Sequence, residues 1–331
     1  MRVAQALSHR AFQPTLVGAL FLFAMFVMPS VLDATWIFNF TQMAIYAIVA
    51  ASVGMLYGRV GLVSLGQVAP YGIGAWVTIR LAYLTDVPYP GVFPLLLIAG
   101  GLVAAIFGLL IGLPALRVSG LYLALVTLLL AVGIEIALNR IKLPTGGPGF
   151  RGVAFAIGDR EPMPRPFVAD GDVAFFRYAV IVAFVMFMIA VAFLASKPGR
   201  AWASVSQSEP SALASGINIT RYKLLAFGLA AFMAGVAGGL YGAHVQSNSS
   251  IAQFDRQAAL FLIAVVLMGG ISSLWGAVLA AFFATIMLPF LTQNVIGHNF
   301  WNDFALTIFG IGLMINLIQT TKAMEKKGLL E

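Results

Sequence analysis

Long apolar segments alternate with short polar ones along almost the whole chain. Ten apolar segments stand out, at residues 15–32, 37–56, 60–81, 92–113, 121–138, 174–195, 224–243, 257–268, 276–291 and 304–318. A helix needs about 20 predominantly apolar residues to cross a bilayer. The pattern therefore predicts an all-α integral membrane protein, a polytopic helical bundle of about ten transmembrane helices. The number falls to eight if the short eighth and ninth segments are re-entrant.

The composition supports one membrane domain that covers residues 1–331. Hydrophobic residues make up 61% of the chain and charged residues 9%, whereas soluble domains carry about 25% charged residues. The 34 glycines and 15 prolines indicate broken or closely packed helices, because lipid cannot satisfy freed backbone groups. The chain has no cysteine, and its three histidines lie in separate segments without metal-ligand spacing, so we predict no metal site.

Charge predicts the orientation, because Lys and Arg concentrate on the cytoplasmic side of a membrane protein. With both termini cytoplasmic, eleven of the 19 basic residues lie inside: Arg2, Arg10, Arg59, Arg117, Lys197, Arg200, Arg221, Lys223, Lys322, Lys326 and Lys327. Residues 15–32 superficially resemble a signal peptide but lack a small-x-small cleavage site, so we treat them as the first span. Residues 139–173, rich in turn-forming Gly and Pro, become an external loop, and residues 197–223 become a cytoplasmic loop.

The cytoplasmic loop contains a predicted short helix at about residues 209–216. Glu209 and Pro210 favour a helix start, and Gly216 favours its end. Between and beside them lies a small, partly apolar surface made by Ala212, Leu213, Ala214 and Ile217. Such a surface suits a groove on a soluble partner, and the alternative is an amphipathic helix that lies on the bilayer.

The third apolar segment carries polar residues that indicate either a translocation pathway or interhelical hydrogen bonding. Its sequence begins GLVSLGQVAPYGIG at residues 61–74. Ser64 and Gln67 are three apart and would share a helix face. Together with Gly66 and Pro70 they interrupt the segment, so we expect this span to be kinked. Irregular backbone survives at membrane depth only where protein or water satisfies it. A related phrase adds Ser272 and Ser273 to the pathway candidates.

Glu135 is the one clearly intramembrane acid. A residue of this kind suggests a relay or pathway site, and pairing with the nearby Arg140 is the alternative. We include Glu135 among the candidate pathway residues.

Residues 224–243 carry a face nearly free of side chains. Gly235 and Gly239 follow each other at four-residue spacing, with Gly238 and Gly242 beside them. Small residues at this spacing allow close approach of membrane helices. The stripe therefore predicts helix packing, or a helix that slides against its neighbour during transport.

The sequence contains no recognisable nucleotide-binding motif. It contains no G-x-x-x-x-G-K-[ST] phosphate loop and no nucleophile elbow, so we predict no enzymatic activity and no bound cofactor. A self-sufficient secondary transporter or channel would be expected to carry more midplane charge than Glu135 alone. A membrane enzyme would need a cluster of acids or histidines at one membrane face. Any ATP-driven activity must use a separate subunit.

Six motifs follow each other along the chain: GLVSLGQ at residues 61–67, LRVSGLYLALVTL at 116–128, TGGPG at 145–149, GRAW at 199–202, SGINITRYKLLAF at 215–227 and GGISSLWGAVLAA at 269–281. With these motifs the chain resembles the permease subunits of bacterial ABC importers for branched-chain amino acids, in particular the LivM-like member of the LivH/LivM pair. In that family an acid followed by x-Ala-Ala forms a coupling helix that contacts the ATPase. Glu209 and Ala212 fit this pattern, whereas Ser211 replaces the first alanine and Pro210 takes the variable place.

The resemblance implies the ABC importer permease fold in the bacterial inner membrane. It implies a LivH-like second permease, two LivG/LivF-like ATPase subunits that use ATP and Mg, and a periplasmic or lipid-anchored solute-binding protein. Permeases for urea and short amides are of the same type and form the alternative. The implied ATPase-coupling residues are Arg200, Glu209, Pro210, Ser211, Ala212, Leu213, Gly216 and Ile217. Nucleic acid need not be invoked as a partner, because basic cytoplasmic loops account for the net charge of +7.

Overall fold

A computed structural model describes residues 21, 23–62, 64–84, 92–116, 121–140, 142–143, 147–148, 169, 171–245, 266 and 274–287. Its elements in chain order are η1 (Phe23–Val27), α2 (Met28–Val31), α3 (Ala34–Met55), η2 (Leu56–Val60), α4 (Val68–Leu84), α5 (Phe93–Ala115), α6 (Leu121–Arg140), β1 (Lys142–Leu143), β2 (Gly147–Pro148), α7 (Asp172–Ala195), α8 (Lys197–Gln207), α9 (Glu209–Ala214), α10 (Ile219–Val245), α12 (Leu274–Phe282) and η6 (Phe283–Met287), where η marks π-helical turns.

Helices dominate the described part of the chain, as the apolar pattern predicts. Four stretches are long and apolar enough to cross a bilayer, namely Ala34–Val60, Phe93–Pro114, Asp172–Ala195 and Ile219–His244. Shorter apolar helices lie at Tyr122–Ile134 and Trp275–Met287. These elements confirm a helical membrane protein. The number of about ten spans and the orientation stay predictions, because segment 304–318 and most of segment 257–268 lie outside the described residues.

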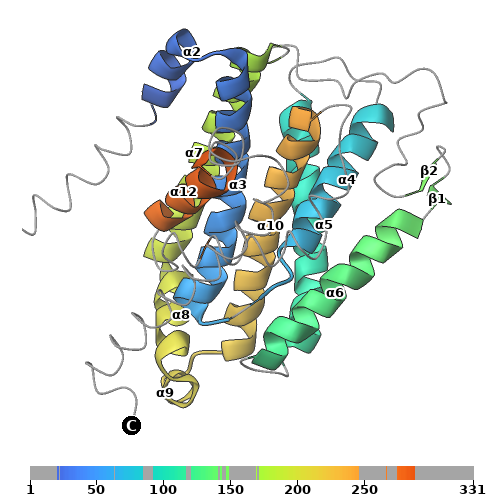
Figure 1. The fold of residues 1–331 in the computed structure, drawn as a ribbon. Helices are drawn as coiled ribbons and strands as arrows, with labels where there is room; N and C mark the ends of the chain where they lie inside the picture. The colour runs from blue at the N-terminus through green and yellow to red at the C-terminus, as the bar shows by residue number, and fades with distance from the viewer. Residues whose placement is uncertain are drawn as a thin grey trace, which may run out of the picture.

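Helix α10 forms the centre of the bundle (Figure 1). It packs against α4 and α5 on one side and against α3 on the other, and α3 in turn contacts α7 and α12. Helix α6 slants along the edge of the bundle and contacts α4 and α5. An element at the centre contacts most of the others, so a movement of α10 would be felt across the fold.

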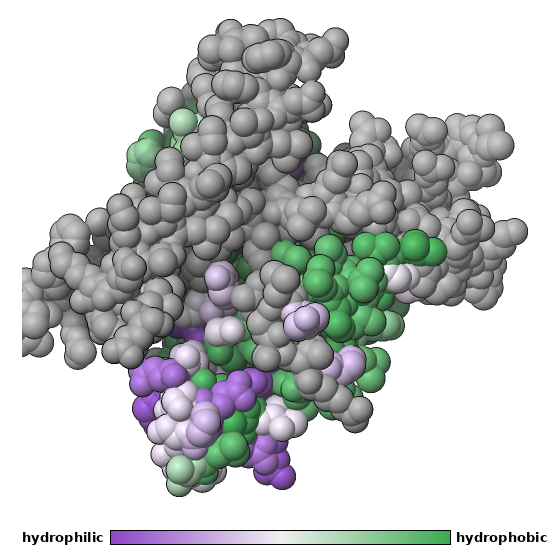
Figure 2. All heavy atoms as spheres, turned by 60° about the horizontal axis from the view of Figure 1, so that its bottom comes forward, coloured by the Kyte–Doolittle hydropathy of each residue, from purple (hydrophilic) through white to green (hydrophobic). Residues whose placement is uncertain are grey.

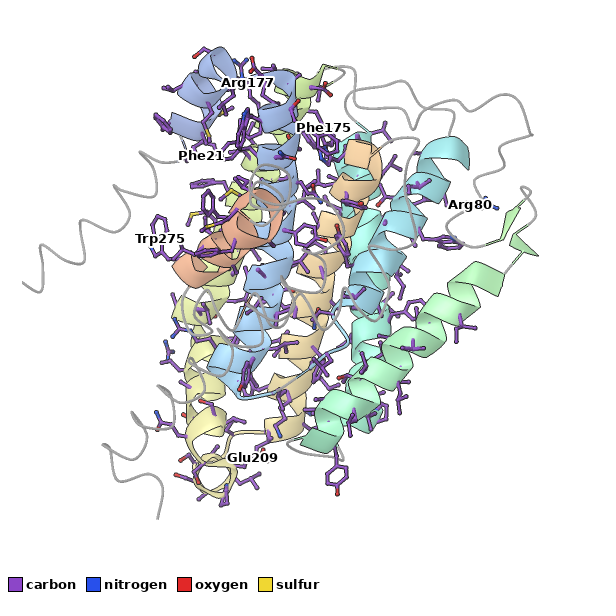
Figure 3. The ribbon with its side chains drawn as sticks, in the orientation of Figure 1. Phe21, Arg80, Phe175, Arg177, Glu209 and Trp275 are labelled. Atoms are coloured by element: carbon purple, nitrogen blue, oxygen red, sulfur yellow. The ribbon has the colours of Figure 1, made fainter. Side chains whose placement is uncertain are left out.

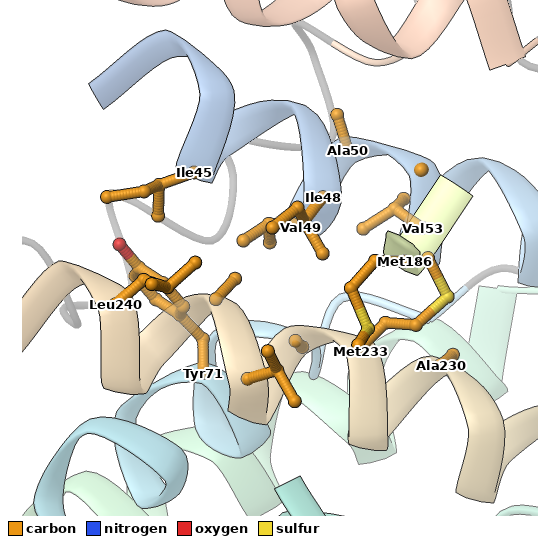
Figure 4. Close-up of a cluster of buried hydrophobic side chains, with 14 of the residues drawn as sticks. Ile45, Ile48, Val49, Ala50, Val53, Tyr71, Met186, Ala230, Met233 and Leu240 are labelled. Atoms are coloured by element: carbon orange, nitrogen blue, oxygen red, sulfur yellow. The ribbon is translucent and has the colours of Figure 1, made fainter. Parts of the chain in front are cut away.

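The core lies between α3, α7 and α10. Figure 4 shows Ile45, Ile48 and Val49 of α3 facing Met233 of α10 and Met186 of α7. Ile45, Ile48 and Met233 are fully buried. Methionine adapts its shape to irregular gaps, which suits this three-helix junction.

The third apolar segment is interrupted, as predicted, but it is not one kinked helix. Helix α4 begins only at Val68, and Gly61 ends η2 with a left-handed φ of 78°. Pro70 therefore lies in the first turn of α4, where its missing N–H costs no helical hydrogen bond. Residues 61–62 and 64–67 are non-helical, so Ser64 and Gln67 do not share a helix face, contrary to the prediction.

Residues 139–173 contain less loop than expected at their ends. Helix α6 continues to Arg140, and α7 begins at Asp172. Just after α6, β1 and β2 form a two-residue antiparallel ladder that pairs Lys142 with Pro148 and Leu143 with Gly147. Gly147 and Pro148 of β2 belong to the turn-rich TGGPG sequence.

Candidate functional site

A helical unit made of α8 and α9 lies at one end of the bundle, between α7 and α10 (Figure 3). Hydrophilic side chains gather at this end of the molecule (Figure 2). Sequence reasoning found α9 but missed α8. The signal was present, because Ala201, Trp202 and Val205 are the buried residues of α8, and their spacing is that of an amphipathic helix.

Helix α8 begins directly after α7, with Ser196 in an extended conformation between them. Gly199 makes this close junction possible, because a methyl group at this position would overlap the carbonyl oxygen of Leu194. Pro198 occupies the first turn, where proline is tolerated. These two residues explain the abrupt start of the unit.

Trp202 packs α8 against both α7 and α10. Its side chain is fully buried, and its indole Nε1 donates to the carbonyl oxygen of Tyr222 in α10 at 2.8 Å. Its ring stacks on Phe193 of α7, with centroids 6.5 Å apart. A buried indole N–H needs such an acceptor, so α8 is tied to the start of α10.

Helix α9 is closed at both ends by local hydrogen bonds. The Ser208 hydroxyl accepts from the backbone N–H of Ser211 at 3.4 Å, an N-cap that sequence reasoning missed. At the other end Gly216 has a φ of 78°. The Gly216 and Ile217 N–H groups donate to the carbonyls of Leu213 and Ala212 at 2.9 and 3.0 Å. This pair of bonds is a Schellman motif, which lets so short a helix hold its shape.

One ion pair anchors α9 to α10. Lys223 Nζ donates to Glu209 Oε1 at 2.7 Å. The Lys223 side chain is 10% exposed and the Glu209 side chain 51%. Lysine is almost never buried without a partner, so Glu209 is what makes the buried Lys223 tolerable.

The outer face of α9 is small and partly apolar. Ala212 is buried against the bundle, whereas Leu213 is 59% exposed. Pro210, Ser211 and Gly216 are exposed as well. Arg200, on α8, is also exposed. The unit therefore presents an apolar side chain to solvent on a rigidly held turn.

The GLVSLGQ segment lies against α6. The Leu65 N–H donates to Thr127 Oγ1 at 3.1 Å, and the Gly66 N–H donates to Ser64 Oγ at 3.3 Å. A methyl group at Gly66 would press on the Thr127 backbone. Thr127 was not singled out from the sequence, although a lone threonine in an apolar run is the kind of residue that satisfies broken backbone.

Gln67 is buried where this segment joins α4. It is 3% exposed, and its Oε1 has no hydrogen-bond partner among the described residues. A buried polar atom without a hydrogen bond costs folding free energy. A buried glutamine such as Gln67 is therefore uncommon at the end of a helix break. Ser64 is also buried.

The glycine stripe of α10 faces α4 and α5. A methyl group at Gly238 would overlap the Tyr71 carbonyl of α4, and one at Gly235 would overlap the Ala104 side chain of α5. Gly239 lies against Thr78 and Leu97, and Gly242 is buried. Close backbone approach of α10 to both helices depends on these small residues.

Three tyrosines from different helices meet inside the bundle, and sequence reasoning missed them. The Tyr71 ring of α4 lies 6.4 Å from Tyr46 of α3 and 5.7 Å from Tyr241 of α10. Tyr71 and Tyr241 are buried. The cluster brings the phenol groups of α3 and α10 next to Tyr71 of α4, the helix that follows the GLVSLGQ segment.

Other pathway candidates are not brought to this region by the described structure. Glu135 belongs to α6, and its side chain lies outside the described part. Ser272 and Ser273 lie outside the described residues. Among the residues that the structure describes, no group of three His, Asp or Glu side chains could hold a metal ion.

Comparisons with known proteins agree with the motifs. Residues 36–317 match the family model described as "Branched-chain amino acid transport system / permease component". The LivM permease protein of the high-affinity branched-chain amino acid transport system is 30% identical in Salmonella typhimurium and 29% identical in Escherichia coli, in each case over 293 residues. These alignments cover 83% of this chain and 66% of each LivM protein, just under two thirds of its length.

A second type of permease also matches. The LivH permease protein of Escherichia coli is 28% identical over 247 residues, which is 71% of this chain and 77% of LivH. No solved structure matches the chain significantly. Because the family model covers most of the chain, including the GLVSLGQ segment and α9, this protein belongs to the family of branched-chain amino acid transport system permease components.

Proposed function

We propose that this chain is one of two permease subunits of an ATP-binding cassette importer in the bacterial inner membrane, and that it helps to move branched-chain amino acids. The family match over residues 36–317 supports the subunit type. The likeness to both LivM and LivH supports pairing with a second, homologous permease. The relatives are transport permeases, so this chain is a translocation subunit rather than an enzyme.

Energy and substrate choice come from other subunits in this proposal. Two ATPases use ATP and Mg on the cytoplasmic side, and a solute-binding protein delivers the amino acid outside. A permease of this kind alternates between two arrangements whose populations are shifted by ligands at both ends. Substrate selectivity then lies mainly in the binding protein.

Helix α9 is the proposed contact with an ATPase, and its geometry is the observation that carries the coupling role. It is held to the bundle by Glu209 and Lys223, yet it leaves Leu213 59% exposed. An apolar anchor on a rigid turn fits a groove on a partner. A helix that lay on the bilayer would need a broader apolar face.

The proposed pathway passes the break before α4. Ser64 and Gln67 are buried there, and Tyr71 lies one turn further along α4. Non-helical backbone at membrane depth commonly lines a binding region of transporters. Glu135, Ser272 and Ser273 remain proposed pathway residues from the sequence.

Reconstitution tests the whole proposal. Vesicles that contain this chain, the second permease and the ATPases should take up labelled leucine only with the binding protein outside and ATP at the ATPase side. Leu213→Asp should abolish ATPase association and uptake, whereas the matched Leu213→Met, which keeps an apolar side chain, should retain both. Leucine uptake by the chain alone without ATP would instead establish a secondary transporter.

A further inference from the structure

An apolar groove of about 320 Å³ opens on the side of the bundle away from α5 and α6. Its walls come from the N-terminal turns, α3, α7 and α12, and include Ala24, Ala44, Ala47, Val180, Phe187 and Trp275. Four alanines, the three named and Ala183, line the groove together with larger apolar side chains. The volume lies at the lower end of the range of small-molecule sites.

The α7 wall of the groove has the length of one membrane leaflet. Arg177, Val180, Phe184 and Phe187 follow each other at spacings of three and four, so they share one face of α7. Ten residues separate Arg177 from Phe187, which is about 15 Å along a helix. That is about half of the hydrocarbon thickness of a bilayer.

Arg177 follows Phe176, which lines the groove, and has more N–H donors than it uses within the described structure. Its Nε donates to the carbonyl oxygen of Met25 at 3.2 Å, which fixes the side chain beside the N-terminal turns (Figure 3). A guanidinium has five N–H donors, and in the part of the chain that the structure describes no carboxylate pairs with Arg177. Arg177 is exposed, so its remaining donors are available to an acceptor outside the bundle.

We propose that this groove binds one acyl chain of an anionic phospholipid, with the lipid phosphate on Arg177. The lipid belongs to the leaflet at the α7 end opposite α8 and α9. Arginine pairs well with phosphate oxygens, and the apolar wall below it extends to the depth of an acyl chain. An apolar helix of the second permease would leave the arginine donors unused, which disfavours it as the occupant.

Fluorescence quenching of Trp275 tests the proposal, because this residue lines the groove. The full chain is placed in phosphatidylcholine vesicles that contain a small fraction of phosphatidylglycerol with bromine on its acyl chains. The contribution of Trp275 is obtained by difference with Trp275→Phe. Brominated phosphatidylglycerol should quench Trp275 at about a tenfold lower mole fraction than brominated phosphatidylcholine. The choline ammonium compensates the phosphate charge of phosphatidylcholine, whereas the phosphate of phosphatidylglycerol keeps its charge for Arg177, and such a hydrogen-bonded charge pair is worth about one decade in affinity.

Matched variants locate the effect. Arg177→Gln should remove the preference for phosphatidylglycerol, Arg177→Lys should keep most of it, and Arg80→Gln, on the far side of the bundle (Figure 3), should keep all of it. Ala44→Phe should reduce quenching by both lipids by filling the groove. Free phosphate should not compete. Equal quenching by the two lipids, or an unchanged preference in Arg177→Gln, would overturn the proposal. An absence of quenching would also overturn it, since another protein segment would then fill the groove.

Discussion

Glu209→Gln is expected to loosen α9 from α10 while the bundle stays folded. The substitution keeps the size of the side chain and removes the charge that meets Lys223 Nζ at 2.7 Å. Because the Glu209 side chain is 51% exposed, solvent screens the attraction itself. The larger effect comes from Lys223, which is 10% exposed and would lose its carboxylate partner inside the protein.

Two limits bracket the magnitude. Exposed ion pairs contribute about 0.2–1 kcal/mol, whereas breaking a buried pair costs about 3–5 kcal/mol. A pair with one buried and one half-exposed member falls between them, and water can reach the lysine as α9 moves. We expect a loss of about 1–2 kcal/mol in the local stability of α9, which is about a tenfold rise in its opening.

Hydrogen exchange measures this opening directly. The N–H groups of Ser211, Gly216 and Ile217 are protected by the cap bonds of α9, so their exchange should quicken about tenfold in Glu209→Gln. The exchange of α10 beyond its first turn should not change. The double variant Glu209→Lys with Lys223→Glu should recover most of the protection, because it restores the pair in reverse.

ATPase binding separates two roles for Glu209. Faster exchange together with weaker ATPase association fits a residue that positions α9. Unchanged exchange with lost ATPase association would refute the anchoring argument, since Glu209 would then act by touching the ATPase itself.

Three further predictions concern packing and backbone. Gly238→Ala should lower the melting temperature of the detergent-solubilised protein by more than 2 °C, because the added methyl group overlaps the Tyr71 carbonyl and a loss of about 1 kcal/mol lowers a melting temperature by at least about 2 °C. The control Gly133→Ala, whose added methyl group has nothing within 4 Å, should be neutral or stabilising. Thr127→Val should cost about 1–3 kcal/mol by leaving the Leu65 N–H without its acceptor, and Thr127→Ser should restore stability. Gly216→Ala should quicken exchange in α9 by about tenfold, because a left-handed φ costs about 1–2 kcal/mol for an alanine.

Local chemistry made part of this fold predictable. The apolar segments 92–113, 121–138, 174–195 and 224–243 coincide with helices, because the bilayer demands long apolar helices whatever their partners. The predicted start of α9 at Glu209 and its end before Gly216 rest on cap chemistry within a few residues, and the structure has both.

Contacts between residues far apart in the chain could not be predicted from the sequence. Glu209 meets Lys223 fourteen positions away, and Leu65 meets Thr127 sixty-two positions away. No periodicity in the sequence links the members of either pair. The sequence also does not distinguish a buried lysine from the other lysines that were counted to predict the orientation. The start of α4 at Val68 was not predicted for a related reason. Pro70 disrupts a helix that continues through it but is harmless in a first turn, and only tertiary contacts decide where α4 begins.

The arrangement of α8, α9 and α10 leads to a last prediction about motion. Trp202 and Glu209 tie α8 and α9 to the start of α10, so the three helices should move as one body when an ATPase pulls on α9. Gly61, by contrast, belongs to the connection between α3 and α4. If the glycine stripe lets α10 slide against α4, then Gly61 and α8 must separate during transport.

A disulfide can test this sliding, because the protein has no cysteine of its own. A Cβ built on Gly61 lies 3.7 Å from Ser206 Cβ, which matches the mean of about 3.8 Å in disulfides. Gly61→Cys carries a strain of about 1–2 kcal/mol from its left-handed φ. The single variants Gly61→Cys and Ser206→Cys are therefore the controls for the double variant. Oxidation of the double variant should stop ATP-driven uptake, and reduction should restore it. Full uptake by the oxidised protein would mean that the close contacts of Gly235, Gly238 and Gly239 are static packing, and that coupling must reach the pathway through another helix pair.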